Sequence, residues 1–159
     1  MPRKEQYCKM ITAKTNSPEE TIEFAKKIGA MLKGGEIIAY KGGLGAGKTT
    51  FTRGLAMGMG LPDEVSSPTF ALVNEYLGKN TSLTLCHFDM YRITSAEALE
   101  TTGFYDYMSD DTVIAVEWSE NIVGCLPDNI ITITISAENG DDSRSITVEG
   151  DERFDLIRN

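Results

Sequence analysis

The sequence is poor in the residues from which several common kinds of site are built. It has one histidine, His87, and its three cysteines lie far apart and never form a Cys-x-x-Cys pair. A disulfide framework, a zinc knuckle, a two-histidine metal helix and a Ser/His/Asp triad therefore have little to be built from. Long apolar runs are also missing, and stretches such as 113–116 are far too short to cross a bilayer. We expect a soluble, cytoplasmic protein with no membrane span and no export signal.

Positive charge is scarce as well. There are 15 Lys and Arg against 24 Asp and Glu, which gives a formal net charge of -9 and a pI near 4.6. This is the wrong sign for wrapping a phosphate backbone by bulk charge, so DNA binding is not expected. Any work on nucleic acid is expected to go through a partner.

The length of 159 residues predicts one domain over 1–159, with a hydrophobic share of 41% that can form a real core. Ser17 and Glu20 form a capping-box pattern for a helix that we expect Gly34 and Gly35 to stop. Residues 36–40 predict a buried strand, followed by a glycine-rich stretch and a helix through about Met59. The remaining expected elements are strands at 69–77 and 82–88 that form a hairpin, a short helix from Thr94 to near Gly103, and a central strand at 112–117 buried on both faces. A closing hairpin of 130–135 and 145–149 is expected to add an antiparallel edge to the sheet.

The stretch Gly42–Thr49 satisfies the phosphate-loop (Walker A) pattern G-x-x-x-x-G-K-[ST], and it lies between a strand and a helix, as the pattern requires. Glycines let successive N–H groups turn toward phosphate oxygens, and the following helix adds its positive end. Lys48 can bridge the terminal phosphates, and the Thr49 hydroxyl can coordinate Mg²⁺. The alternative is a glycine turn with an exposed lysine, which would not require a strand before the stretch and a helix after it. The sequence thus predicts an α/β, three-layer P-loop NTPase fold with a mostly parallel central sheet and antiparallel hairpin additions.

A phosphate loop also needs a second acidic group for Mg²⁺, usually at the end of a neighbouring buried strand. Glu117 ends the strand 112–117 and is our first candidate, against the alternative that it is merely the first solvated residue after the strand. Asp89 follows the strand 82–88, and it could position metal or water, or cap a turn. Which of the two carboxylates is the main metal ligand stays open from sequence.

Three further features have both a functional and a structural interpretation. The hydroxyls of Ser67 and Thr69 could sense the γ-phosphate in a switch-like loop, or belong to a polar turn that opens a strand. Arg92 could neutralise transferred charge or contact a partner, or form a surface ion pair. Trp118 could stack on a base, although a lone tryptophan beside a core strand is more often packing.

Four blocks together closely resemble the bacterial TsaE (YjeE) family in order and spacing, over nearly the whole chain. They are residues 42–50, 67–70, 87–92 and 117–120, with the sequences GGLGAGKTT, SPTF, HFDMYR and EWSE. The resemblance implies an ATPase that works with partners that resemble TsaB and TsaD in threonylcarbamoyl modification of adenosine 37 of tRNAs that read ANN codons. Because the sequence shows no clear lid and no obvious arginine finger, we expect a weak Mg²⁺-dependent ATPase that its partners activate. It also implies that tRNA is met mainly through the complex.

The same resemblance implies roles for individual residues. Thr49 and Glu117 would be the protein ligands of Mg²⁺, and Asp89 would belong to the catalytic machinery. Apart from the resemblance, we expect Lys48 to act with Asp89 in catalysis, and Glu120 to join Arg92 and Trp118 as candidate contacts for charge or a partner. The phosphates of ATP would be held by Gly42, Gly45, Ala46, Gly47, Lys48, Thr49 and Thr50. One departure is visible, because the family commonly carries Asp where this chain has Gly43.

Two rival functions are alternatives to an ATP-hydrolysing subunit. A small-molecule kinase would also fit the loop, but it usually needs an arginine-bearing lid, and the arginines after the loop form no cluster in the sequence. A GTP switch would need an Asn-Lys-x-Asp motif to read guanine, and the sequence has none.

Overall fold

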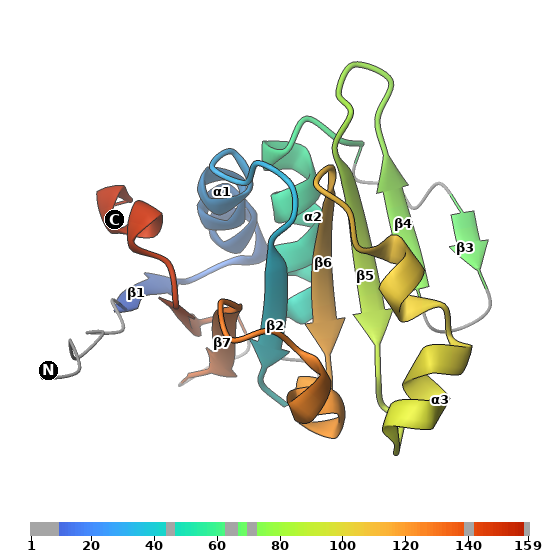
Figure 1. Ribbon diagram of the computed structural model, residues 1–159. Helices are drawn as coiled ribbons and strands as arrows, with labels where there is room; N and C mark the ends of the chain where they lie inside the picture. The colour runs from blue at the N-terminus through green and yellow to red at the C-terminus, as the bar shows by residue number, and fades with distance from the viewer. Residues whose placement is uncertain (1–9, 44–46, 63–66, 70–72, 139–141, 158–159) are drawn as a thin grey trace, which may run out of the picture.

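The computed structural model describes residues 10–43, 47–62, 67–69, 73–138 and 142–157, and these form one eight-stranded mixed sheet with helices on both faces (Figure 1). The strand order is β1-β8-β7-β2-β6-β5-β4-β3. The strands are β1 (Met10–Thr15), β2 (Ile37–Lys41), β3 (Ser67–Thr69), β4 (Val73–Leu77), β5 (Thr84–Asp89), β6 (Thr112–Glu117), β7 (Ile131–Ala137) and β8 (Arg144–Glu149). The helices are α1 (Pro18–Gly29), α2 (Lys48–Gly58) and α3 (Ala96–Thr101), with 3₁₀ turns η1 (Phe104–Tyr107), η2 (Ser119–Cys125) and η3 (Glu152–Leu156).

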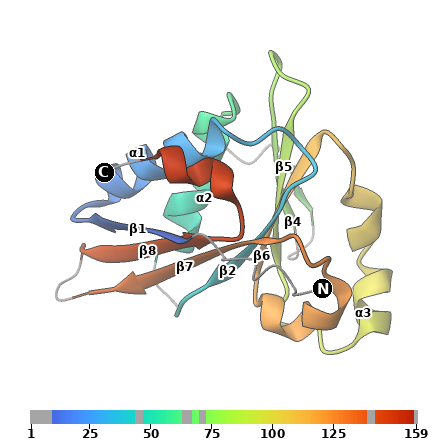
Figure 2. The ribbon, with the colours of Figure 1, turned by 60° about the vertical axis from the view of Figure 1, so that its left-hand side comes forward.

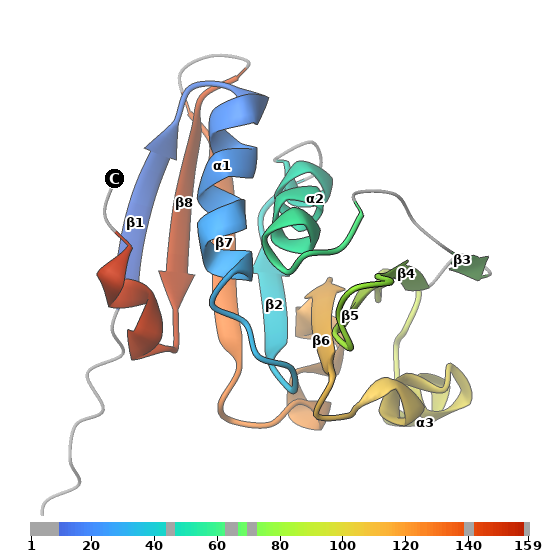
Figure 3. The ribbon, with the colours of Figure 1, turned by 90° about the horizontal axis from the view of Figure 1, so that it is seen from above.

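The four central strands β7, β2, β6 and β5 run parallel, and antiparallel strands extend the sheet on both sides. Helices α1 and α2 lie on one face, whereas α3 and the orange η2 lie on the other (Figures 2 and 3). Each face has its own hydrophobic cluster. The α/β class and the three-layer arrangement predicted from the sequence are confirmed.

Strand β6 lies at the centre of the parallel part, between β2 and β5, as its apolar sequence predicts. Val113 and Ala115 pack into the cluster under α1 and α2, whereas Ile114 and Val116 pack into the cluster under α3. Alternation along the strand explains this, because successive side chains point to opposite faces. Glu117 is the next residue on the α2 face.

Helix α1 begins as the sequence predicts. The Ser17 hydroxyl accepts from the Glu20 backbone N–H at 3.1 Å, and the Glu20 carboxylate accepts from the Asn16 N–H at 2.6 Å. The helix ends at Gly29, earlier than expected, and two 3₁₀-type bonds from the N–H groups of Met31 and Leu32 follow it. The final turn is therefore tighter than a continued α-helix.

Three expectations on elements were wrong. The strand expected over 69–77 is interrupted, because β3 and β4 are separate strands paired antiparallel, with Ser67 opposite Glu75 and Thr69 opposite Val73. The short helix α3 is capped by Ser95, whose hydroxyl accepts from the Ala98 N–H at 3.1 Å, and not by Thr94. The closing hairpin is not the edge of the sheet, because β1, which the sequence did not reveal, pairs with β8.

The turn between α1 and β2 is anchored by η3. Arg153 donates to the Glu36 carboxylate at 2.7 Å and to the Met31 carbonyl at 3.1 Å, and its second nitrogen lies 2.9 Å from Asp151. Glu36 also accepts from the Gly34 N–H at 2.6 Å. This cluster fixes the start of β2, the strand that leads into the phosphate loop.

In the part of the chain that the structure describes, no helix has the length and apolar character that crossing a bilayer requires.

Helices α1 and α2 pack closely because glycines face the contact. A Cβ added at Gly54 would lie 2.5 Å from the Ala25 Cβ and 2.8 Å from the Ile22 carbonyl oxygen. Gly29 and Gly58 are equally confined, by backbone of Leu55 and Lys26. These glycines let α2 approach α1 closely, and so help to set where its N-terminus lies.

We expect Gly54→Ala to lower the free energy of unfolding by about 1–3 kcal/mol, because the added methyl group overpacks the helix contact. The loss corresponds to a fall in Tm of about 2–12 °C for a domain of this size. Gly124→Ala is the matched control, because an added Cβ there meets no atom within 4 Å. Thermal unfolding followed by circular dichroism measures both variants, and equal Tm values for Gly54→Ala and the wild type would contradict the packing argument.

Candidate functional site

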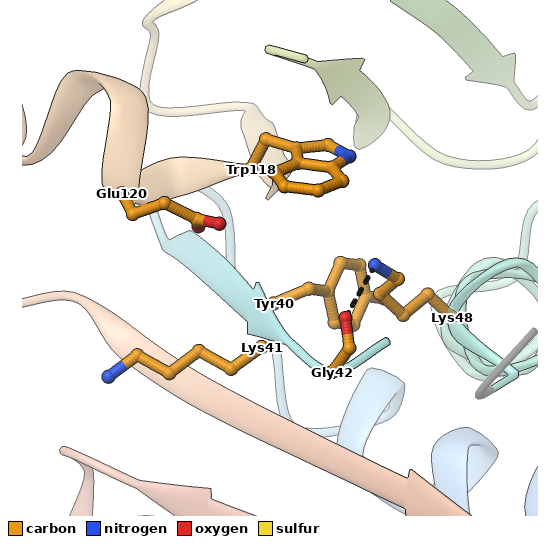
Figure 4. A pocket seen from close by; sticks show the side chains of 6 residues that line it. All are labelled: Tyr40, Lys41, Gly42, Lys48, Trp118 and Glu120. Carbon is orange, nitrogen blue, oxygen red and sulfur yellow. Dashed lines mark hydrogen bonds between the residues drawn. The ribbon is translucent and has the colours of Figure 1, made fainter. Parts of the chain in front are cut away.

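The phosphate-loop lysine lies at the N-terminus of α2. Gly47 caps the helix in a left-handed conformation, with φ 106°, which favours glycine. Gly42 also has a positive φ of 147°. The Lys48 ammonium reaches back across the loop and donates to the Gly42 carbonyl at 3.1 Å (Figure 4). Lys48 therefore joins the two ends of the loop, and its side chain is almost fully buried.

A cavity of about 300 Å³ opens beside Lys48. Its lining residues are Tyr40, Lys41, Gly42, Lys48, Trp118 and Glu120. The Lys48 ammonium is 6.0 Å from the centre of the Trp118 ring, whereas the Lys41 side chain points away from both (Figure 4). Trp118 has φ 60°, the only positive φ of a non-glycine residue in the described ranges, and its ring meets Tyr91 edge-on with centroids 5.0 Å apart.

A second, smaller cavity of about 40 Å³ lies beside the same helix start. It is lined by Pro18, Thr21, Gly47, Thr50, Asp142 and Arg144. Lys48 lines the first cavity and Thr50 the second, so the two cavities are reached from the same turn of α2.

The two candidate carboxylates end neighbouring parallel strands in register, because Asp89 on β5 pairs with Glu117 on β6. They differ in environment. Asp89 is exposed, and its Oδ1 accepts from the Tyr91 N–H at 3.0 Å, which is the turn-capping arrangement. Glu117 is largely buried, with 15% of its side chain exposed.

Glu117 is held in its ionised form by its neighbours. His87 Nε2 lies 3.3 Å from Glu117 Oε1, and this approach lowers the pKa of the carboxyl below its ordinary value. Burial acts in the opposite direction, and the positive charge of Lys48 lowers the pKa further. An ionised carboxylate near Lys48 is what a phosphate-loop metal site requires.

The donor set fits Mg²⁺ rather than a metal held wholly by protein. Within the ranges described, no three His, Cys, Asp or Glu residues gather to hold an ion. Glu117 would supply a carboxylate and Thr49, on the exposed side of the first turn of α2, a hydroxyl. Mg²⁺ commonly takes one or two protein ligands and completes its shell with phosphate oxygens and water. The expected pair of ligands therefore suits a metal that arrives with a nucleotide.

The other predicted residues are placed as follows. Ser67 and Thr69 lie in strand β3 rather than in a loop, and their side chains lie outside the described part. Gly45 and Ala46 also lie outside the described residues. Arg92 is exposed in the turn after β5, and Glu120 is exposed at the mouth of the larger cavity.

The sequence analysis missed three residues of the candidate site. Tyr40 and Lys41, at the end of β2, line the larger cavity, and His87 contacts Glu117. The signal for His87 was present, because it precedes Asp89 by two residues on one strand and so shares its face.

A family model described as threonylcarbamoyl adenosine biosynthesis protein TsaE matches residues 15–146. The tRNA threonylcarbamoyladenosine biosynthesis protein TsaE of Bacillus subtilis is 40% identical over 139 residues, which cover 87% of this chain and 85% of the relative. The protein of that name from Treponema pallidum is 36% identical over 134 residues, covering 84% and 96%. The crystal structure of Bacillus subtilis YdiB matches with a TM-score of 0.73 and 33% identity, covering 96% of this chain and 93% of that one.

The Asp89 turn can be tested by stability. We expect Asp89→Ala to lower the free energy of unfolding by about 0.5–1.5 kcal/mol, because the Tyr91 N–H loses its acceptor. Asp89→Asn keeps an oxygen at the Oδ1 position and should stay close to the wild type. Urea unfolding measures both, and equal losses in the two variants would show that the hydrogen bond does not support the turn.

Proposed function

The chain belongs to the TsaE family of tRNA threonylcarbamoyladenosine biosynthesis proteins, and we propose that it acts there as an ATP-binding and ATP-hydrolysing accessory subunit. The observation that carries the proposal is the convergence of Lys48, at the start of α2, with an ionised Glu117 at the end of β6. Such a pair brings a cation for phosphate and an anion for a metal to one side of a phosphate loop.

The two cavities suggest how the nucleotide lies. The terminal phosphates would face Lys48 and the larger cavity, because the lysine of this motif binds the terminal phosphates. The nucleoside end would then face Thr50 and Arg144 in the smaller cavity. Free N–H groups of the first turn of α2 would bind the phosphates between them.

Each site residue has a distinct proposed role in hydrolysis. Lys48 neutralises charge that develops on the terminal phosphate, and Thr49 and Glu117 hold the metal. A Mg²⁺ ion held by Thr49 and Glu117 would supply positive charge that stabilises the negatively charged leaving group. Asp89, at the end of the strand beside Glu117, orients the attacking water. Ser67 and Thr69 are proposed to respond to the γ-phosphate.

The partners are proposed from the family likeness and from charge. A net charge of -9 makes direct capture of tRNA unfavourable, so tRNA would be met mainly through TsaB- and TsaD-like proteins. Our candidates for partner contact are Trp118 and Glu120, which line the larger cavity, and Arg92, which is exposed in the turn after β5. We propose that the protein acts in the cytoplasm, where the tRNA substrate is made.

Nucleotide and metal binding should separate in two variants. We expect Lys48→Ala to weaken ATP binding by about 10–100-fold, because it removes a charged hydrogen bond to phosphate. We expect Glu117→Gln to change the Kd for ATP, measured in EDTA, by no more than about twofold. The same variant should raise the Mg²⁺ concentration needed for half-saturation about tenfold. Isothermal titration calorimetry measures both. Lys79→Ala is the control, because Lys79 is exposed in the turn between β4 and β5, at the end of β5 opposite Asp89. Unchanged ATP binding in Lys48→Ala would overturn the proposed function.

Hydrolysis should depend on the partners. We expect slow release of phosphate from ATP by the isolated chain and at least tenfold faster release with TsaB- and TsaD-like proteins present, because partner contacts would complete the site. In a phosphate-release assay, Asp89→Asn, which should be about as stable as the wild type, should lose the acceleration if Asp89 orients the attacking water. Brisk hydrolysis that partners leave unchanged, or transfer of the γ-phosphate to a small-molecule acceptor, would contradict the subunit role.

A further inference from the structure

His87 is a buried polar side chain with an unusual environment. It lies on β5 with 7% of its surface exposed, and its Nε2 atom makes no hydrogen bond of good geometry to any residue in the described ranges. Its polar neighbour is Glu117 Oε1, at 3.3 Å. Buried polar atoms are nearly always hydrogen-bonded, and an exception needs a physical reason.

The ring of His87 is held in place from the side of the phosphate loop. Tyr40 on β2 meets it edge-on, with ring centres 5.9 Å apart and planes at 73°. The Tyr40 hydroxyl lies 2.8 Å from the Thr52 hydroxyl, which donates to the Lys48 carbonyl at 2.8 Å. A continuous buried path therefore runs from the helix that carries Lys48, through Tyr40, to the imidazole.

Strand alternation explains why His87 faces Glu117. Leu85 and Val113 both pack in the cluster under α1 and α2, and His87 follows Leu85 by two residues on β5. Glu117 follows Val113 by four residues on β6, and so projects from the same face of the sheet. The contact thus comes from two adjacent strands of the rigid central sheet and from no loop.

We propose that His87 is a positioning residue for Glu117, which holds Oε1 and so presents Oε2 toward the divalent cation of a bound nucleotide. This inference rests on the proposed function. An Nε2–H proton is all that the contact requires, and either the neutral tautomer or the imidazolium supplies it. A small rotation of the carboxylate turns the 3.3 Å approach into a hydrogen bond. Carboxylates that bind metals are commonly oriented by such a donor, and its loss typically weakens metal binding 10–100-fold.

The test uses the only tryptophan of the chain as its probe. Trp118 follows Glu117 directly and lies 6.0 Å from the Lys48 ammonium, so its fluorescence reports on this site alone. ATP is titrated in EDTA, and Mg²⁺ is then titrated into the ATP-bound full chain. We expect His87→Leu to raise the Mg²⁺ midpoint at least tenfold while ATP affinity in EDTA stays within twofold. His87→Gln, which keeps an N–H near the Nε2 position, should retain a midpoint within threefold of the wild type.

Two controls separate positioning from packing. Cys86→Ala removes a neighbouring buried side chain of β5 that packs in the opposite core, and it should leave the Mg²⁺ midpoint unchanged. If His87→Leu does not fold, His87→Asn replaces it, because its shorter side chain cannot reach Oε1 and should give the same loss.

The outcomes distinguish the inference from the function on which it rests. A wild type whose fluorescence responds to neither ATP nor Mg²⁺ overturns both. A responsive wild type with an unchanged Mg²⁺ midpoint in His87→Leu overturns the positioning role alone. If His87→Leu loses as much ATP affinity in EDTA as Mg²⁺ affinity, His87 only packs. The same conclusion follows if His87→Gln raises the Mg²⁺ midpoint as much as His87→Leu does.

Discussion

The hydrogen bond between Tyr40 and Thr52 joins the two elements between which the phosphate loop lies. Tyr40 belongs to the strand before the loop and Thr52 to the helix after it, and their hydroxyls lie 2.8 Å apart in the core. Burial raises the pKa of Tyr40 far above its ordinary value, so the hydroxyl stays neutral and keeps its bond. With the bond from Lys48 to Gly42, it fixes the ends of the loop. A polyphosphate that binds there would thus meet a helix N-terminus whose position is already set, which reduces the ordering cost of binding.

The central parallel strands bring the acidic groups to that loop. Because β5 and β6 are parallel and in register, Asp89 and Glu117 end side by side, yet their environments separate them. Asp89 is exposed and caps a turn, whereas Glu117 is buried against His87 and feels the charge of Lys48. This difference in environment supports our proposal that Glu117, rather than Asp89, is the metal carboxylate.

Trp118 connects this interior to the surface. Its left-handed backbone conformation is costly for a bulky residue and persists only where the surroundings enforce it. Trp118 lies between the end of β6 and the start of η2, and its ring centre is 6.0 Å from the Lys48 ammonium and 5.0 Å from the ring centre of Tyr91, a residue that is 62% exposed. An aromatic contact thus links the residue that would bind phosphate to a surface that a partner can reach.

The sequence by itself determined the features that depend on neighbouring residues. The loop from Gly42 to Thr49, the Ser17 cap and the two-sided burial of β6 each follow from local spacing, because turns, caps and strand alternation are set over a few residues. Tertiary structure alone decided the pairing of His87 with Glu117 and the place of β1, whose small inward residues Ala13 and Thr15 give a weak apolar signal. Such contacts join residues far apart in the chain, and they exist only once strand order and register are established.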